Sequence, residues 1–189
     1  MLARSEIRGP RVAVHSATLA ERFDVLNPRV LRALRAGHEA LDRLQVRHVL
    51  VGGLAVGIYG RVRVTKDVEF LVGPEAFDSV GVLVSFRSGV PLSAEGVPID
   101  SILAPAEHEA VLGAALVDPL VVDGIPVIRV EALIYMKLVA SRRQDLADVV
   151  SMLREGDVDV ARARALLDTT EPALRARFEE LLAEADAEE

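Results

Sequence analysis

Cysteine is absent from the sequence, which excludes disulfide bonds and thiolate metal sites. Any metal ion must therefore be held by carboxylates or by the four histidines, His15, His38, His48 and His108. These histidines show no metal-ligand spacing, so we interpret them as structural or surface residues. A Ser-His-Asp or G-x-S-x-G arrangement is also missing, which leaves no support for a hydrolase triad.

Long apolar runs are missing too. No stretch approaches the ~18 to 20 consecutive apolar residues of a membrane span. The first ten residues, MLARSEIRGP, lack the apolar core of a signal peptide, so we expect a cytoplasmic protein without membrane contact. Yet 51% of the 189 residues are apolar, enough for a real core in one domain or in a domain with a small appendage.

Lysine is scarce. The chain has 20 arginines but only two lysines, Lys66 and Lys137, and a net charge of −7. This charge argues against broad electrostatic binding to nucleic acid, but a local basic patch remains compatible with it. One lysine lies beside an acidic pair and the other in a second motif. Either the positions of the two lysines reflect function, or the chain uses arginine in place of lysine throughout and these two positions have no special role.

The stretch Val49 to Val72 organises the chain. It predicts a short apolar strand, a Gly-Gly turn, a helical segment and a second strand that opens with Asp67 and Glu69. Residues two apart on a strand share a face, so these two carboxylates project together. Buried carboxylates are costly unless a positive charge joins them, and a divalent cation prefers such oxygen ligands. The alternative is an ordinary polar strand end.

The turn Gly52-Gly53 follows a buried strand and precedes a helical segment, so its backbone N–H groups could face a phosphate. Its spacing fits neither the G-x-G-x-x-G nor the Walker pattern, and a purely structural turn is the alternative. Arg61, Arg63 and Thr65 would share a face of an extended strand, where they could neutralise a triphosphate or grip an RNA backbone. The alternative is an exposed edge strand kept soluble by charge.

The remaining pattern predicts an α/β (α+β) fold, with a small mixed-sheet core in residues 1–130 and a helical part in residues 131–189. Outside the central stretch, we expect these helices and strands, in chain order: a helix from Asn27-Pro28 to about Gln45, a helix over Glu75 to Phe86, a strand over Val97 to Leu103, a helix from Pro105 to about Leu116, and a hairpin around Asp123-Gly124. Asp100 stands in an otherwise apolar strand, which makes it the best third carboxylate.

The second motif is Lys137 to Asp148. On a helix, Lys137, Ser141, Asp145 and Asp148 fall within an arc of about 80°. Arg142 would lie on the apolar side of a continuous helix, which indicates a break near residues 141–143. The alternative for this motif is a surface ladder of i, i+4 charges.

From Gly52 to Glu69 the residues fit GG-x-A-x(4)-G-x-x-R-x-T-x-D-x-E. This pattern resembles the signature of the DNA polymerase β-type nucleotidyltransferases, and among them the AbiEii/AbiGii toxin-like branch. The second motif is similar to a family run of lysine, arginine, lysine and aspartate, with Gln144 in place of the second lysine. The resemblance covers roughly Val49 to Leu153. Glu69 departs from the family, where aspartate is commoner.

The resemblance implies a Mg²⁺ site, a nucleotide site and a set of catalytic residues. Mg²⁺ would be held by Asp67, Glu69 and Asp100. The nucleoside triphosphate would be bound by Gly52, Gly53, Arg63, Thr65, Lys66 and Lys137. The catalytic residues would be Asp67, Glu69, Asp100, Lys137 and Asp145. Lys137 would reach the phosphates, Asp145 would orient it or a neighbouring base, and Asp100 would help to deprotonate the attacking hydroxyl.

The function implied is Mg²⁺-dependent transfer of a nucleoside monophosphate from the triphosphate to a hydroxyl of tRNA or of a protein. Such an enzyme could be the toxin of a toxin–antitoxin system, with a cognate antitoxin or another protein as partner. The alternative is a non-catalytic protein of the same fold that acts as a partner-binding or antitoxin-like regulator. An antitoxin-like regulator would expose an apolar stripe on Val158 to Phe178.

Overall fold

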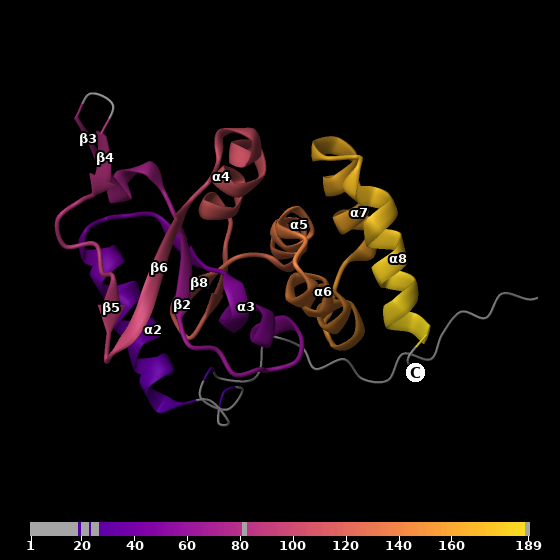
Figure 1. The fold of residues 1–189 in the computed structure, drawn as a ribbon, viewed down its shortest axis with the longest axis horizontal. Helices are drawn as coiled ribbons and strands as arrows, with labels where there is room; N and C mark the ends of the chain where they lie inside the picture. The colour runs from indigo at the N-terminus through magenta and orange to yellow at the C-terminus, as the bar shows by residue number, and fades with distance from the viewer. Residues whose placement is uncertain (1–18, 20–22, 24–26, 81–82, 188–189) are drawn as a thin grey trace, which may run out of the picture.

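The computed structural model describes Leu19, Phe23 and residues 27–80 and 83–187, so His15 lies outside the described residues. Its described part is a mixed α/β fold with a six-stranded sheet and a helical C-terminal part (Figure 1). The fold class predicted from the sequence is therefore confirmed. The division at residue 130 stays a prediction.

The sheet has the strand order β5-β6-β2-β1-β8-β7. Its strands are β1 (His48–Leu50), β2 (Val68–Val72), β5 (Ser93–Ala94), β6 (Val97–Leu103), β7 (Leu120–Val122) and β8 (Ile125–Val127). Strand β2 runs antiparallel to β1 and parallel to β6, and its Glu69 lies opposite Asp100. This register brings carboxylates that are 31 positions apart in the sequence onto neighbouring strands.

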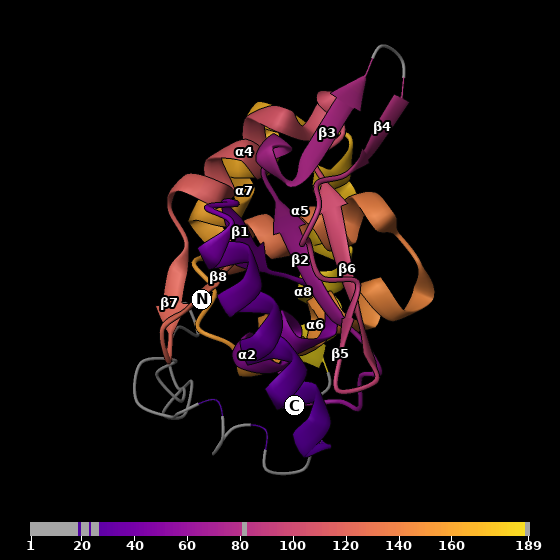
Figure 2. The ribbon, with the colours of Figure 1, turned by 90° about the vertical axis from the view of Figure 1, so that its left-hand side faces the viewer.

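Helices cover the two faces of the sheet unequally (Figures 1 and 2). Helix α2 (Pro28–Arg43) packs on one face, and the Asn27 side chain accepts a hydrogen bond from the Arg29 N–H as its N-cap. The other helices are α3 (Gly52–Tyr59), α4 (Glu109–Val117), α5 (Val130–Ala140), α6 (Arg143–Glu155), α7 (Val160–Thr170) and α8 (Leu174–Ala187). Helices α3, α5 and α6 pack together on the face opposite α2.

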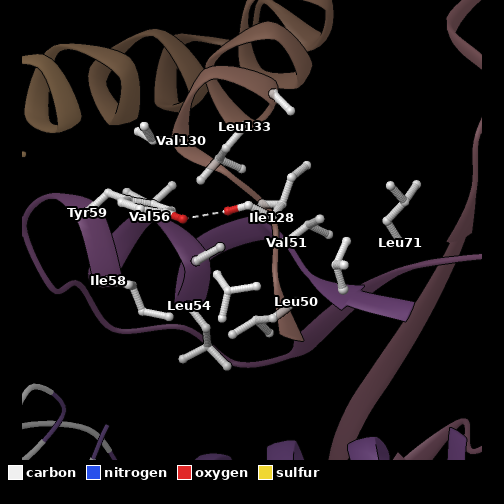
Figure 3. Packing of buried hydrophobic residues seen from close by; sticks show 14 of the residues in the cluster. Leu50, Val51, Leu54, Val56, Ile58, Tyr59, Leu71, Ile128, Val130 and Leu133 are labelled. Atoms are coloured by element: carbon white, nitrogen blue, oxygen red, sulfur yellow. Dashed lines mark hydrogen bonds between the residues drawn. The ribbon is translucent and has the colours of Figure 1, made fainter. Parts of the chain in front are cut away.

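Helix α3 is buried along its whole length, because it is apolar on every side. Figure 3 shows its Leu54 beside Leu50 of β1, while Leu133 of α5 lies on the opposite side of the helix. At its end, the Tyr59 hydroxyl donates to the backbone oxygen of Ile128 at 2.7 Å. The core therefore fixes where α3 begins, at the Gly52-Gly53 turn.

The helix predicted over Glu75 to Phe86 is wrong. A 3₁₀ turn (η1, Pro74–Ala76) is followed by a separate hairpin of β3 (Phe77–Val80) and β4 (Leu83–Phe86), which projects from the body (Figures 1 and 2). The apolar spacing fits a helix, but most of the apolar residues in this stretch are valine or phenylalanine, which favour strands. The Phe77 and Phe86 rings stack across the hairpin with their centroids 5.0 Å apart.

The C-terminal helices confirm the predicted break. Helix α5 ends at Ala140, Ser141 adopts a left-handed φ of 53°, and α6 begins at Arg143.

Farther along, the apolar side chains between Val158 and Phe178 are largely buried, with Leu167 and Phe178 at 1% and 0% exposure. Among the described residues, every helix is too short or too polar to cross a membrane.

Candidate functional site

Three carboxylates lie on or beside the neighbouring strands β2 and β6. Asp67 directly precedes β2, Glu69 lies within β2, and Asp100 lies opposite Glu69 in β6. Burial raises the pKa of Glu69, and the negative charges of Asp67 and Asp100 raise it further, against the opposing effects of the Gly53 N–H and Lys137. The raised pKa of Glu69 thus reflects mainly its burial, and the charges of the two neighbouring aspartates add to it.

The Gly52-Gly53 turn lies directly against Glu69. The Gly53 N–H donates to Glu69 Oε2 at 3.3 Å. Gly52 has a left-handed φ of 64°, and a Cβ at this position would collide with the Glu69 carboxylate. A Cβ at Gly53 would lie 3.2 Å from both the Arg63 guanidinium and the Thr65 hydroxyl. Gly52 is thus required by its left-handed φ and by the close approach of Glu69, whereas a Cβ at Gly53 would make tight contacts with Arg63 and Thr65.

The basic run does not form the extended strand that the sequence predicts. Residues 61–67 form an irregular connection, because the Arg61 N–H donates to the Ser151 hydroxyl of α6 instead of to a neighbouring strand. Arg61 also pairs with Glu155 of α6 at 3.4 Å, and Lys66 is exposed. Thr65 is buried and donates to Asp67 Oδ1 at 2.9 Å.

The second motif forms a buried ion-pair network rather than a surface ladder. Lys137 Nζ lies 2.8 Å from Asp145 Oδ1 and 2.9 Å from Asp148 Oδ2, and the three side chains are 11%, 6% and 3% exposed. The Arg142 Nε donates to Asp145 at 2.9 Å, and Gln144 donates to Asp148 at 2.9 Å. The break after α5 makes this arrangement possible, since it folds α6 back beside Lys137.

Arg63 joins the two motifs. Its guanidinium donates to both carboxylate oxygens of Asp148, at 3.0 and 3.1 Å, while it lies over Gly53. Asp148 is the residue that sequence reasoning left out of the site. Its position on the same helical face as Lys137 and Asp145 was the available signal, but its partner Arg63 is 85 positions away.

The buried aspartates predict how stability depends on pH. Burial raises the pKa of Asp148, but hydrogen bonds from Arg63, Gln144 and Lys137 outweigh it, so the pKa lies below its ordinary value of 3.8. A carboxyl with a lowered pKa stabilises the fold above its unfolded pKa and loses that contribution as the pH falls through the folded pKa. We therefore expect the free energy of unfolding to fall below about pH 4.

Urea denaturation at pH 6, 4 and 3 checks this expectation, with Asp148→Asn as the comparison. The variant should lose less stability than the wild type between pH 4 and pH 3, because its residue 148 cannot titrate. Equal losses in the two proteins would show that Asp148 makes no contribution to the acid sensitivity.

A divalent cation fits the site in donor type but not in the present side-chain arrangement. Asp67, Glu69 and Asp100 offer carboxylate oxygens, the ligands that Mg²⁺ prefers. However, within the ranges that the structure describes, no group of three or more His, Asp or Glu side chains is placed to hold a metal ion. Glu69 would have to turn from Gly52 toward Asp67 and Asp100.

A cavity of about 460 Å³ opens beside the network, lined by residues that include Arg61, Arg63, Arg154, Asp148 and Glu184. Its mixed charges suit a polar ligand better than a purely anionic one. The cavity shows that there is space next to Arg63, on the side of α6.

Comparisons with known proteins add little. No protein-family model matches the chain, and no curated protein matches it. Among solved structures, the fold is similar to that of an antigenic nucleotidyltransferase-like protein from Paracoccidioides brasiliensis, with a TM-score of 0.40 and 14% identity over 81% of this chain and 93% of that chain. A likeness at this level concerns the general fold, and no residue role is carried over from it.

Proposed function

We propose that this protein is a Mg²⁺-dependent nucleotidyltransferase. The observation that carries the proposal is the strand register that sets Asp100 of β6 opposite Glu69 of β2, two residues after Asp67, with Glu69 in contact with the Gly52-Gly53 turn at the start of α3. Carboxylates beside a helix N-terminus combine a place for hard cations with a place for phosphate oxygens.

Residues at the turn and residues on the strands would have different roles in this reaction. The Gly53 N–H and the N-terminus of α3 would bind a phosphate group, and Arg63 and Thr65 close over the same turn. Mg²⁺, held by Asp67, Glu69 and Asp100, would neutralise charge on the attacking and leaving oxygens.

The acceptor would enter on the open side of the carboxylates. Asp100 is exposed, so it can take the proton of an acceptor hydroxyl. That oxygen then bonds to the α-phosphorus, and the bond to the β-phosphate oxygen breaks to release pyrophosphate.

Two details follow from the sequence resemblance alone. The first is the acceptor, a hydroxyl of tRNA or of a protein. The second is the biological role, a cytoplasmic toxin of the AbiEii/AbiGii type with a cognate antitoxin. Both stay predictions.

A non-catalytic protein of this fold is the second candidate. It is favoured by the ion pairs of Lys137 and Arg63, since two of the three cations expected to bind the triphosphate already pair with Asp145 and Asp148. The antitoxin-like form of this alternative is disfavoured, because the apolar side chains between Val158 and Phe178 are largely buried rather than exposed.

A thermal-shift titration tests the proposed function. ATP, GTP, CTP and UTP are each added with and without Mg²⁺ to the wild type and to Asp67→Asn. A nucleotide at 100 times its dissociation constant should stabilise the wild type by about 2.7 kcal/mol, a shift of several degrees. This shift should require Mg²⁺ and be lost in Asp67→Asn. If no nucleotide shifts the wild type, the non-catalytic alternative is the better account.

A further inference from the structure

We propose that the Glu69 carboxylate occupies the phosphate position of the Gly52-Gly53 turn in the ligand-free protein, and that it must leave before a triphosphate binds. This inference rests on the proposed function, because it concerns how the same site is opened. It assigns Glu69 a second task beside cation binding, as an internal competitor of the substrate.

The contacts at the turn carry the inference. Glu69 Oε2 accepts the Gly53 N–H at 3.3 Å, and its carboxylate lies over Gly52 so closely that a Cβ there would collide with it. A carboxylate and a phosphate oxygen seek the same N–H and the same positive end of the helix. Arg63 and Thr65 lie close to Gly53 on the same turn, so a phosphate that takes the Gly53 N–H would compete with Glu69 for this donor.

The length of the Glu69 side chain explains how it reaches the turn. Residue 69 belongs to β2, and the backbone of its partner Asp100 lies directly alongside. An aspartate would have one methylene fewer between backbone and carboxylate, so it would stay nearer the strand, beside Asp67 and Asp100. The glutamate found here, where the resembled family commonly has aspartate, extends the carboxylate from the strand to the turn.

Glu69 cannot occupy the Gly52-Gly53 turn and bind a cation at the same time. A carboxylate that turns to join Asp67 and Asp100 around a cation releases the Gly53 N–H. The cation and the triphosphate should then favour each other's binding, and by thermodynamic linkage the coupling is mutual. Without a cation, the turn should reject phosphates.

Binding of inorganic pyrophosphate in the presence of EDTA tests this directly, measured by calorimetry at low salt. We expect Glu69→Ala to bind pyrophosphate about tenfold or more tightly than the wild type, because the competing charge at the turn is gone. Asp67→Ala is the matched control, since it removes one charge from the same set of three carboxylates. Asp67 accepts its hydrogen bond from Thr65, whereas Glu69 accepts from the turn. Its affinity for pyrophosphate should rise clearly less than that of Glu69→Ala.

Two results would overturn the inference: no gain in Glu69→Ala, or an equal gain in Asp67→Ala. Glu69→Asp provides a second variant that keeps the charge and shortens the side chain. It should bind metal-free pyrophosphate more tightly than the wild type and less tightly than Glu69→Ala, and wild-type affinity in this variant would also contradict the inference.

The outcome is separable from that of the proposed function. If the wild type binds nucleotides with Mg²⁺ but Glu69→Ala gains no metal-free pyrophosphate binding, the enzyme proposal stands and the competitor role falls. If Glu69→Ala gains pyrophosphate binding while no nucleotide binds the wild type with Mg²⁺, Glu69 is a competitor in a protein that lacks the proposed activity.

Discussion

The Asp148→Ala variant is expected to lose about 3 to 5 kcal/mol of unfolding free energy, because the change removes one partner of a buried charge network. Asp148 is 3% exposed and accepts hydrogen bonds from Arg63, Gln144 and Lys137. Without it, Arg63 loses its ion pair, and Lys137 keeps only Asp145, which also pairs with Arg142. Chemical denaturation of the variant and the wild type at pH 7 measures the loss.

A surface pair of the same geometry supplies the control. Asp118 accepts two hydrogen bonds from the Arg129 guanidinium, both at 2.9 Å, but its side chain is 67% exposed. We expect Asp118→Ala to lose clearly less unfolding free energy than Asp148→Ala, since water screens an exposed pair. If the two variants lose equal stability, the network around Asp148 is not a buried structural unit, and its ion pairs carry little of the fold.

The Gly52→Ala variant should show the second large effect. An alanine in the left-handed region costs about 1 to 2 kcal/mol. Its methyl group would also displace the Glu69 carboxylate, and overpacking of this kind costs about 1 to 3 kcal/mol more. The expected loss of unfolding free energy is therefore about 2 to 5 kcal/mol.

Gly96→Ala separates the two contributions. Gly96 has a left-handed φ of 75°, but a Cβ there would meet nothing within 4 Å. This variant should show the backbone cost alone, about 1 to 2 kcal/mol. In Gly52→Ala, a second change of Glu69 to alanine should restore part of the loss. Equal losses at the two glycines would mean that Glu69 does not press against Gly52.

Local patterns in the sequence predict much of this structure. The strand that contains Glu69, the Gly52-Gly53 turn and the break near Ser141 each follow from spacing and residue type within a few positions. The neighbouring positions of Glu69 and Asp100 required only that two apolar strands pair in parallel.

The parts that sequence reasoning missed depend on distant partners or on competing local preferences. Nothing near Arg63 reveals that it pairs with Asp148, or that this pair closes over Gly53. The charges of the second motif fit a surface ladder equally well until packing buries Lys137. The hairpin at Phe77 was missed for the other reason, because its apolar spacing matches a helix while its residue types favour strands.

Binding of Mn²⁺ in place of Mg²⁺, followed by electron paramagnetic resonance in the presence of a non-hydrolysable nucleoside triphosphate, tests the central claim most directly. The account predicts that the wild type binds Mn²⁺ and that Asp67→Asn and Asp100→Asn each weaken this binding by about tenfold or more. Asp78→Asn, a change of an exposed carboxylate on the hairpin, should leave it unaltered. Unchanged Mn²⁺ affinity in both Asp67→Asn and Asp100→Asn would contradict a cation site between β2 and β6.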